Sequence, residues 1–467
     1  MSMKTYDVVV IGAGPAGEAL VGRLAAKGRD VAIVESHLVG GECSFYACMP
    51  SKALLRPAQA LAEVRRVPGA AKAVDGGVDV PAVLRRRDEV VHDLDDSAQT
   101  PWLRSRGVDL IRGHGRLDGE RRVRVGDDVY EARQAVVIAV GSGAAMPPIP
   151  GLGDAAPWTN REATLARAIP GRLIVLGGGV VGVEMAQAYA TLGCVVTVIE
   201  AEQRLLAREE PFVSAQLADA LAELGVDLRL GVRAESVRRE AGVVRIALSD
   251  GVFVEGDEIL LAVGRRPLTD DLGLESVGLT PGELVEVDDR LQVPAHEWLY
   301  AIGDVNGRSL LTHMGKYQAR VLSEVLDGGS GCATRDDAGA PRVVFTEPQV
   351  AAVGMTLRSA TDAGIAARAY DVESSATPGA SFHGRNTPGT CRIVVDETRG
   401  VIVGATFTGT DVAEWLHAAT IAIVGETPIE LLWEAIPAFP ARSEIWLKLL
   451  ERHETSVINA TIDDEPS

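Results

Sequence analysis

The sequence predicts an α/β fold that contains two Rossmann-like dinucleotide-binding domains. The first observation is a GxGxxG turn at residues 12–17, directly between a β-branched strand and a helical run. The second is the return of this pattern at residues 177–182 in the same setting. The third is length, because 467 residues are too many for one hydrophobic core and indicate several domains.

The first unit has its elements in the order of a phosphate-binding βαβ motif. Residues 7–11 predict a buried parallel strand that leads into the turn. Gly12, Gly14 and Gly17 allow the backbone to turn tightly and to approach a pyrophosphate at a helix N-terminus. A helix and a second strand follow, and that strand ends at Glu35, where an acid would bind a ribose hydroxyl.

The second unit repeats this order. A strand at residues 172–176 leads into the turn, and a helix and a strand ending at Glu200 follow it. The turn glycines are Gly177, Gly179 and Gly182. Glu200 would hydrogen-bond a free ribose 2′-hydroxyl and repel a 2′-phosphate, so the sequence favours NADH over NADPH. Arg204 and Arg208, a few residues later, argue against this preference for NADH.

Two cysteines, Cys43 and Cys48, lie just after the first unit and just before an alanine- and leucine-rich helical run. The residues between them allow a small disulfide ring, which would be strained and easily reduced. Cys48 would stand at the helix start, where unpaired amides and the helix dipole favour a thiolate. A structural disulfide or an unrelated pair of thiols is the alternative interpretation.

Charge and composition exclude several classes of partner. Acidic residues outnumber basic ones, 65 to 46, which argues against nucleic acid and anionic membranes as partners. Five cysteines in a long chain do not indicate a secreted disulfide framework, and we expect no metal site. The N-terminus shows no signal peptide, and the apolar stretch 173–199 is interrupted by glycines and Glu184, so we expect a cytoplasmic protein.

The segment Gly40–Lys52, GGECSFYACMPSK, resembles the redox-disulfide motif of the class I pyridine nucleotide-disulfide oxidoreductases, which include dihydrolipoamide dehydrogenase, glutathione reductase and mercuric reductase. The resemblance covers essentially the whole chain. It implies FAD on the first unit, NAD(P)H on the second, and a C-terminal α+β domain that makes a homodimer, with a helix at residues 411–424. The implied segments are 1–149 and 267–340 for FAD, 150–266 for NAD(P), and 341–467 for dimerisation.

The resemblance also implies roles for individual residues. Cys48 would be the sulfur against the flavin, and Cys43 the one that exchanges with substrate. Lys52 and Glu184 match residues that pair beside the reactive flavin nitrogen, where such a pair would modulate the charge of reduced flavin. Asp304 would hold the ribityl chain of FAD. Further contacts with the two cofactors are expected at Gly41, Gly141, Gly264, Gly303 and His313, the last as a positioning residue.

The C-terminal region departs from the family pattern at one position. In the disulfide-reducing members a histidine from the partner subunit, oriented by a glutamate five residues later, is the acid/base for the exchanging thiol. Here Glu444 is retained as a candidate catalytic residue, but Phe439 occupies the histidine position. Phenylalanine cannot transfer a proton, and such help is worth roughly 10²–10⁴-fold. Phe45 and Tyr46, bulky residues inside the cysteine motif, can also reshape the pocket.

Three hypotheses about function follow. The leading one is a homodimeric FAD enzyme, with its active site shared across the interface, that passes electrons from NAD(P)H through Cys43 and Cys48 to a disulfide-type or other small acceptor. A second is a quinone or diaphorase-type reductase that works directly from reduced flavin. A third, from another class, is a non-catalytic flavoprotein subunit or redox sensor. The sequence leaves the acceptor, the physiological direction and the pathway open.

Overall fold

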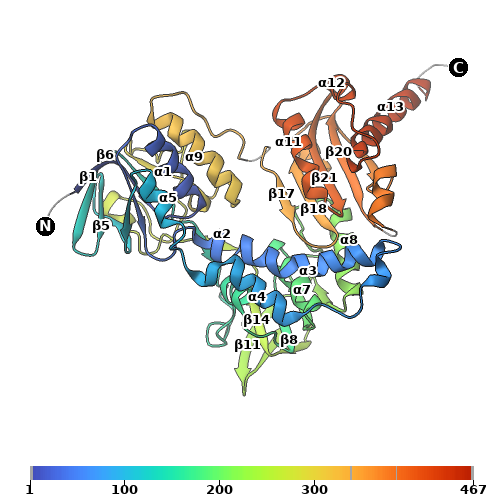
Figure 1. Ribbon diagram of the computed structural model, residues 1–467, viewed down its shortest axis with the longest axis horizontal. Helices are drawn as coiled ribbons and strands as arrows, with labels where there is room; N and C mark the ends of the chain where they lie inside the picture. The colour runs from blue at the N-terminus through green and yellow to red at the C-terminus, as the bar shows by residue number, and fades with distance from the viewer. Residues whose placement is uncertain (1–3, 337–338, 385–386, 464–467) are drawn as a thin grey trace.

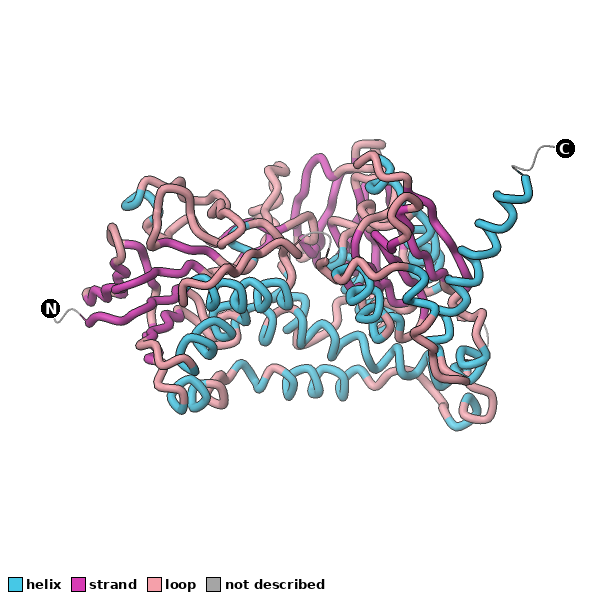
Figure 2. Tube along the Cα trace, turned by 90° about the horizontal axis from the view of Figure 1, so that it is seen from above, coloured by secondary structure: helices cyan, strands magenta, loops and turns pink. Residues whose placement is uncertain are grey.

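The computed structural model describes residues 4–336, 339–384 and 387–463. Three sheet-containing lobes lie around two long helices, α3 (Cys48–Arg66) and α4 (Val80–Val90), as Figure 1 shows. Helix α3 runs from the N-terminal lobe to a position beneath the C-terminal one. The view from above in Figure 2 shows the last helix, α13 (Ile445–Asp463), projecting beyond the rest of the chain.

The N-terminal lobe is built on a seven-stranded sheet in the order β3-β2-β1-β6-β5-β4, with β16 paired to β6. The strands are β1 (Lys4–Ile11), β2 (Val31–Glu35), β3 (Asp109–Arg112), β4 (Gly115–Leu117), β5 (Arg122–Val125), β6 (Asp128–Ile138) and β16 (Leu299–Ala301). Strands β1, β2, β3, β6 and β16 pair in parallel, as the β-branched run predicted. Since β16 comes from far along the chain, this lobe is completed by a segment that returns after the second lobe.

Strand β1 is buried on both faces, which explains its uninterrupted β-branched sequence. Val8 and Val10 pack on one face with residues of α1 (Pro15–Ala26) and α9 (Thr312–Leu326). Val9 and Ile11 pack on the opposite face. The short helices α2 (Gly41–Phe45) and α5 (Thr100–Ser105) complete the lobe.

The central lobe carries a parallel sheet in the order β10-β9-β8-β14 and an antiparallel sheet β11-β12-β13. The parallel strands are β8 (Arg172–Leu176), β9 (Val195–Glu200), β10 (Asp227–Leu230) and β14 (Glu258–Leu261). The antiparallel strands are β11 (Ala234–Glu240), β12 (Val243–Leu248) and β13 (Phe253–Gly256). The helices are α6 (Asn160–Leu165), α7 (Val180–Thr191) and α8 (Pro211–Glu223). Strands β7 (Ser142–Ala144) and β15 (Arg265–Pro267) pair where the chain passes between lobes.

The apolar stretch at residues 173–199 is β8, α7 and β9, and its burial explains its composition. Helix α7 packs in one cluster with residues of α3, α4 and the C-terminal sheet, so apolar side chains surround it. None of the helices in the described ranges combines the length and apolar character that crossing a bilayer requires.

The C-terminal lobe is a five-stranded antiparallel sheet with helices, in the order β17-β18-β21-β20-β19. The strands are β17 (Arg342–Val344), β18 (Gln349–Gly354), β19 (Ala367–Glu373), β20 (Thr390–Asp396) and β21 (Val401–Gly409). The further helices are α10 (Leu357–Asp362), α11 (Leu416–Val424) and α12 (Ile429–Trp433). The helix expected from Asp411 begins later, because Asp411 has a left-handed backbone with φ of 55°. The α/β prediction with a C-terminal α+β region is confirmed.

Candidate active site

The two glycine turns have the close packing that their sequences predicted. A Cβ on Gly12 would lie 2.4 Å from the carbonyl oxygen of Ala139, and one on Gly17 would lie 2.1 Å from that of Gly12. In the second turn, a Cβ on Gly182 would lie 1.9 Å from the carbonyl oxygen of Gly177. A side chain at these positions would collide with backbone, so each turn requires glycine.

Gly14 and Gly179, the middle glycines, each stand at the N-terminus of a helix. A Cβ on Gly14 would meet nothing within 4 Å, and one on Gly179 would meet only a carbonyl oxygen at 3.9 Å. Open space beside unpaired helix amides is what a pyrophosphate needs.

The acids that end β2 and β9 reach back to these turns. Glu35 accepts hydrogen bonds from the backbone N–H of Ala13 at 2.8 Å and of His37 at 2.7 Å. Glu200 accepts them from the N–H of Gly178 and of Glu202, the latter at 2.7 Å. The two carboxylates therefore occupy equivalent places.

A cleft of about 210 Å³ runs along the first turn. Its walls include Cys43, Gly141, Asp304 and Thr312, together with Gly12, Gly14, Glu35, Gly41 and Gly303 from the predicted set. A second cavity of about 320 Å³ shares Gly12 and Glu35 with it. The two form an extended site that suits a long dinucleotide.

Cys43 and Cys48 are both thiols, in α2 and at the first residue of α3. The Cys48 sulfur lies 3.5 Å from the hydroxyl oxygen of Thr312. The hydrogen bond from Cys43, the Thr312 hydroxyl and the charge of Lys52 lower the pKa of Cys48 to about 6 against the opposing effect of burial. The hydrogen bond with Cys48 and burial raise the pKa of Cys43. The pair is therefore arranged as one thiolate and one thiol.

Lys52 follows Cys48 by one turn of α3 and pairs with Glu184 of α7. Its Nζ lies 2.8 Å from Oε2 of Glu184, whose side chain is only 4% exposed. The other carboxylate oxygen accepts a hydrogen bond of 2.8 Å from the backbone N–H of Phe345. Lys52 also lies 4.8 Å from the centre of the Phe345 ring. Because each partner has a second contact, the pair is held in a fixed place beside the cysteines.

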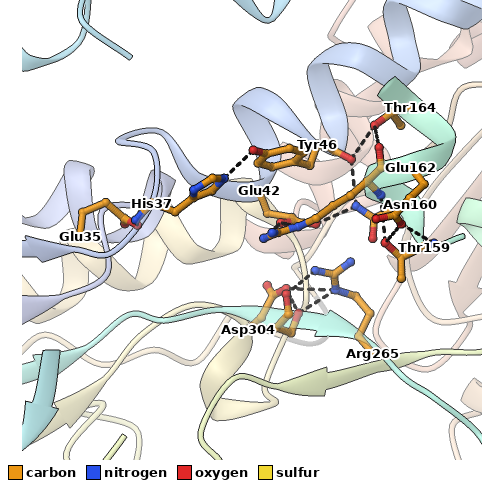
Figure 3. Close-up of polar contacts among 12 residues, drawn as sticks. Glu35, His37, Glu42, Tyr46, Thr159, Asn160, Glu162, Thr164, Arg265 and Asp304 are labelled. Carbon is orange, nitrogen blue, oxygen red and sulfur yellow. Dashed lines mark hydrogen bonds and ion pairs between the residues drawn. The ribbon is translucent and has the colours of Figure 1, made fainter. Parts of the chain in front are cut away.

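Asp304 lines the cleft and forms a small polar network with Ser142 and Arg265, as Figure 3 shows for Asp304 and Arg265. Ser142 donates a hydrogen bond of 2.5 Å to Asp304, and Arg265 Nε lies 3.6 Å from the same carboxylate oxygen. Gly141, Gly264 and Gly303 all have positive φ, as the turns around this network require. His313 is on α9, and its Nε2 donates to the carbonyl oxygen of Pro341 at 2.8 Å.

Sequence reasoning missed a set of contacts that fixes the cysteine segment to α6. Glu42 accepts hydrogen bonds from Arg161 at 2.6 Å and from Asn160 at 2.7 Å. The Arg161 guanidinium lies over the Tyr46 ring, 4.5 Å from its centre. Nε2 of His37 is 2.5 Å from the Tyr46 hydroxyl (Figure 3). A charged residue, Glu42, next to two glycines could have indicated that this segment makes a polar contact. No residue near Glu42 in the sequence indicated that its partner is Arg161.

The bulky residues of the motif differ in their placement. Tyr46 lines the cleft, whereas Phe45 is buried in a small cluster with Tyr46 and Val91. Glu444 is also buried, and its carboxylate accepts a hydrogen bond from the N–H of Ala441 at 3.3 Å. Phe439 is 75% exposed. Neither Glu444 nor Phe439 lines the cleft of its own chain.

Comparisons with known proteins agree with this geometry. Residues 6–319 match the pyridine nucleotide-disulphide oxidoreductase family, and residues 340–450 match the dimerisation domain of that family. The dihydrolipoyl dehydrogenase of Chlamydia muridarum is 30% identical over 455 residues, which are 95% of this chain and 96% of that protein.

Two solved structures are similar over nearly the whole chain. The Cu(II) complex of the HOCl-induced flavoprotein disulfide reductase RclA from Escherichia coli has a TM-score of 0.85 at 28% identity, covering 96% of this chain and 99% of that one. LpdA from Mycobacterium tuberculosis has a TM-score of 0.84 at 26% identity, with the same coverage.

The chain therefore belongs to the pyridine nucleotide-disulphide oxidoreductase family. It is an FAD-dependent oxidoreductase of the class that exchanges electrons between NAD(P)H and disulfides. Its C-terminal dimerisation domain supports a homodimer.

Proposed function

We propose that this enzyme passes electrons from NADH through FAD and the Cys43–Cys48 pair to a small acceptor that needs no imidazole for proton transfer. The observation that carries the proposal is the cysteine pair itself. Cys43 lies on the wall of the cleft, and Cys48 is stabilised as a thiolate with Lys52 near it. A thiolate beside a thiol at such a wall suits thiol–disulfide exchange.

The residues of the cleft fit FAD. The open space at Gly14 and the N-terminus of α1 would take its pyrophosphate, and Glu35 a ribose hydroxyl. Asp304 would bind the ribityl chain. The remaining contacts would come from Gly12, Gly17, Gly41, Gly141, Gly303, Lys52 and His313.

The second turn would bind the nicotinamide dinucleotide through Gly177, Gly179, Gly182 and Gly264. Glu200 would accept a hydrogen bond from the free 2′-hydroxyl of NADH. Arg204, one of the two arginines that oppose this preference, donates to the carbonyl oxygens of Ala207 and Glu209 and to the Ser214 hydroxyl. Since its guanidinium already has three partners, Arg204 is a poor ligand for a 2′-phosphate. Arg208 is exposed and remains the one arginine of the two that opposes NADH as the preferred donor.

When bound, FAD accepts two electrons from the nicotinamide and makes them available to a disulfide. Two electrons and one proton then convert the Cys43–Cys48 disulfide into a Cys43 thiol and a Cys48 thiolate. The exchanging sulfur of Cys43, after passing its proton to the Cys48 thiolate, attacks one sulfur of a disulfide acceptor and releases the other as a thiolate, which takes that proton from Cys48. Attack by Cys48 on Cys43 releases the second thiolate and restores the disulfide.

The role of Lys52 and Glu184 is to place one positive charge beside the flavin and Cys48. Glu184 is buried and hydrogen-bonded on both oxygens, so it fixes the position of the Lys52 ammonium. That charge favours the Cys48 thiolate and would favour the anionic form of reduced flavin.

The acceptor is where this enzyme departs from dihydrolipoyl dehydrogenase. In a homodimer, the loop that carries Phe439 would complete the cleft of the partner, and Glu444 would sit behind it. A phenyl ring there transfers no proton, so the acceptor must be one whose leaving group departs without protonation at that position. The exposed Phe439 ring also favours the second candidate, direct reduction of a quinone at the flavin, because it offers an aromatic surface.

Substitution of Cys43 by serine distinguishes these candidates. We expect Cys43→Ser to abolish NADH-dependent reduction of small disulfides, including lipoamide, glutathione disulfide and mixed disulfides. Cys332→Ser is the matched control, because Cys332 is exposed and lies outside the cleft. If Cys43→Ser retains both its quinone rate and its disulfide rate, the cysteine pair is not on the electron path and the proposal is wrong.

A further inference from the structure

A second cluster of chemically active side chains lies away from the cleft, where the end of α3 meets the C-terminal lobe. It consists of Glu63 on α3, His383 at the end of the short helix η5 (Pro378–His383), and Asp411 at the turn after β21. One imidazole nitrogen and two carboxylate oxygens of these residues all lie within 4.8 Å of one another. All three side chains are partly exposed, so an ion can reach them from solvent.

Two of these donors have no other task. Among the described residues, His383 has no hydrogen-bond partner and the Asp411 carboxylate accepts no hydrogen bond; Glu63 has one loose contact, 3.7 Å from Arg56. The three side chains converge without hydrogen-bonding to each other. Two ligands of a tetrahedral zinc ion lie about 3.4 Å apart, so the donor atoms, which lie up to 4.8 Å apart, would move together by roughly 1 to 1.5 Å when an ion binds.

Arg66 holds the three donor-bearing segments in place. Its side chain bonds Glu347 at 2.9 Å and the hydroxyl of Thr410, the neighbour of Asp411, at 3.2 Å. Gly384, the neighbour of His383, packs so closely on Arg66 that a Cβ there would lie 2.6 Å from the Cβ of Arg66. Glu63 is one helical turn before Arg66 on α3. The donors are thus pre-positioned by contacts that do not use their own polar atoms.

The charges around the donors are nearly balanced. The carboxylates of Glu347 and Asp411 lie near the guanidiniums of Arg66 and Arg442, and Glu63 lies 3.7 Å from Arg56. A bound ion is therefore favoured by the convergence of one imidazole and two carboxylates, not by an excess of negative charge.

We propose that Glu63, His383 and Asp411 form a binding site for a divalent transition-metal ion of the zinc type. The imidazole selects against calcium and magnesium, and three protein ligands leave a position for water. The bound ion would join the helix that begins at Cys48 to the C-terminal lobe. It would also brace η5, whose Gly379 packs directly on Ala441 in the loop that carries Phe439. Local spacing gave no sign of this site, because its ligands are separated by long stretches of chain.

The test is zinc binding by the FAD-loaded enzyme with Cys43 and Cys48 oxidised to the disulfide, so that thiolates do not compete. We expect one Zn²⁺ per chain after dialysis against ZnCl₂, measured by elemental analysis. His383→Ala and Asp411→Asn should each weaken binding at least about 10-fold, measured by competition with a chromophoric chelator. Asn tolerates the left-handed backbone at position 411, and flavin content checks the fold of each variant.

Two controls separate this site from others. His417→Ala changes an exposed histidine of the same lobe and should bind Zn²⁺ as the wild type does. The double variant Cys43→Ser/Cys48→Ser should also bind Zn²⁺. Adding Zn²⁺ should raise its melting temperature by a few degrees. Absence of stoichiometric zinc, unchanged affinity in both ligand variants, or loss of zinc in the double cysteine variant would each overturn the proposal.

Discussion

The two dinucleotide-binding turns have the same internal geometry. A Cβ on Gly12 would lie 2.4 Å from the carbonyl oxygen of Ala139, and one on Gly177 would lie 2.4 Å from that of Ala262. In both turns an acid at the end of the next strand accepts a hydrogen bond from the turn. Two stretches of sequence with little in common besides their glycines therefore build the same backbone.

Their surroundings differ. Gly41, just ahead of the cysteines, packs on the first turn so closely that a Cβ there would lie 2.8 Å from the Cα of Gly14. The middle glycines are alike, since a Cβ on Gly14 would meet nothing within 4 Å and one on Gly179 only a carbonyl oxygen at 3.9 Å. The first turn also lines a cleft whose walls include Gly303 and Thr312, from far along the chain. A turn enclosed by several distant segments suits a cofactor that stays bound.

Alanine at the third glycine of each turn gives the largest expected effects. We expect Gly17→Ala to abolish stable FAD binding, because its Cβ would collide with backbone. Gly182→Ala should retain FAD yet lose more than about 100-fold in its rate of reduction by NADH, while dithionite still reduces it. The ratio of flavin absorbance to protein absorbance measures FAD binding, and anaerobic stopped-flow absorbance measures the rate of flavin reduction by NADH. Loss of flavin from Gly182→Ala would remove the proposed distinction between the turns.

The second prediction concerns the loop that departs from the family. Phe439→His should raise the rate of lipoamide reduction, by as much as roughly 10²–10⁴-fold if the imidazole acts as acid/base. Phe439→Leu is the control, since it removes the ring without adding a proton carrier. If both variants reduce lipoamide at the wild-type rate, the residue at position 439 does not determine the acceptor.

The third prediction uses the pKa of Cys48. Because that pKa is lowered to about 6, the thiolate of the reduced enzyme is present above this pH and is lost as the pH falls through it. Cys43→Ala removes the hydrogen bond that is the largest cause of the shift, so the titration midpoint of Cys48 should rise. Cys43→Ser keeps a donor and should raise it less. The pH dependence of alkylation by iodoacetamide measures the midpoint, and an unchanged value in Cys43→Ala contradicts the assignment.

The smallest effect is expected at Glu200. Glu200→Gln removes the charge that would repel a 2′-phosphate, and the ratio of kcat/KM for NADPH to that for NADH should rise by about 10-fold. Glu35→Gln, the equivalent change in the first unit, should leave that ratio unaltered. Steady-state kinetics with both donors checks it, and a ratio that moves only in Glu35→Gln would reverse the two cofactor assignments.

Local patterns predicted the parts of the fold that are themselves local. The glycine turns, the strands beside them and the place of Cys48 at a helix start are fixed by neighbours in sequence, and the structure shows all three. The helix expected from Asp411 begins late because a left-handed residue interrupts it, and nothing in the residue types there marks that conformation.

Contacts between distant segments were harder to predict. The contacts of Glu42 with Arg161 depend on how α6 packs against the cysteine segment, which no spacing encodes. The resemblance to a known family brought Lys52 and Glu184 together, and the structure places them in contact. The family resemblance did not predict the contact between Tyr46 and His37. That contact exists because this chain has a bulky residue, Tyr46, in the cysteine motif.

The central claim is that Cys48 is the thiolate that faces the flavin. Anaerobic titration of the FAD-loaded enzyme with NADH tests it most directly. We expect a long-wavelength absorbance to appear as two electrons are added, from thiolate-to-flavin charge transfer, to disappear below about pH 6, and to be absent in Cys48→Ser. Bleaching of the flavin without that absorbance, or its survival in Cys48→Ser, would contradict the claim.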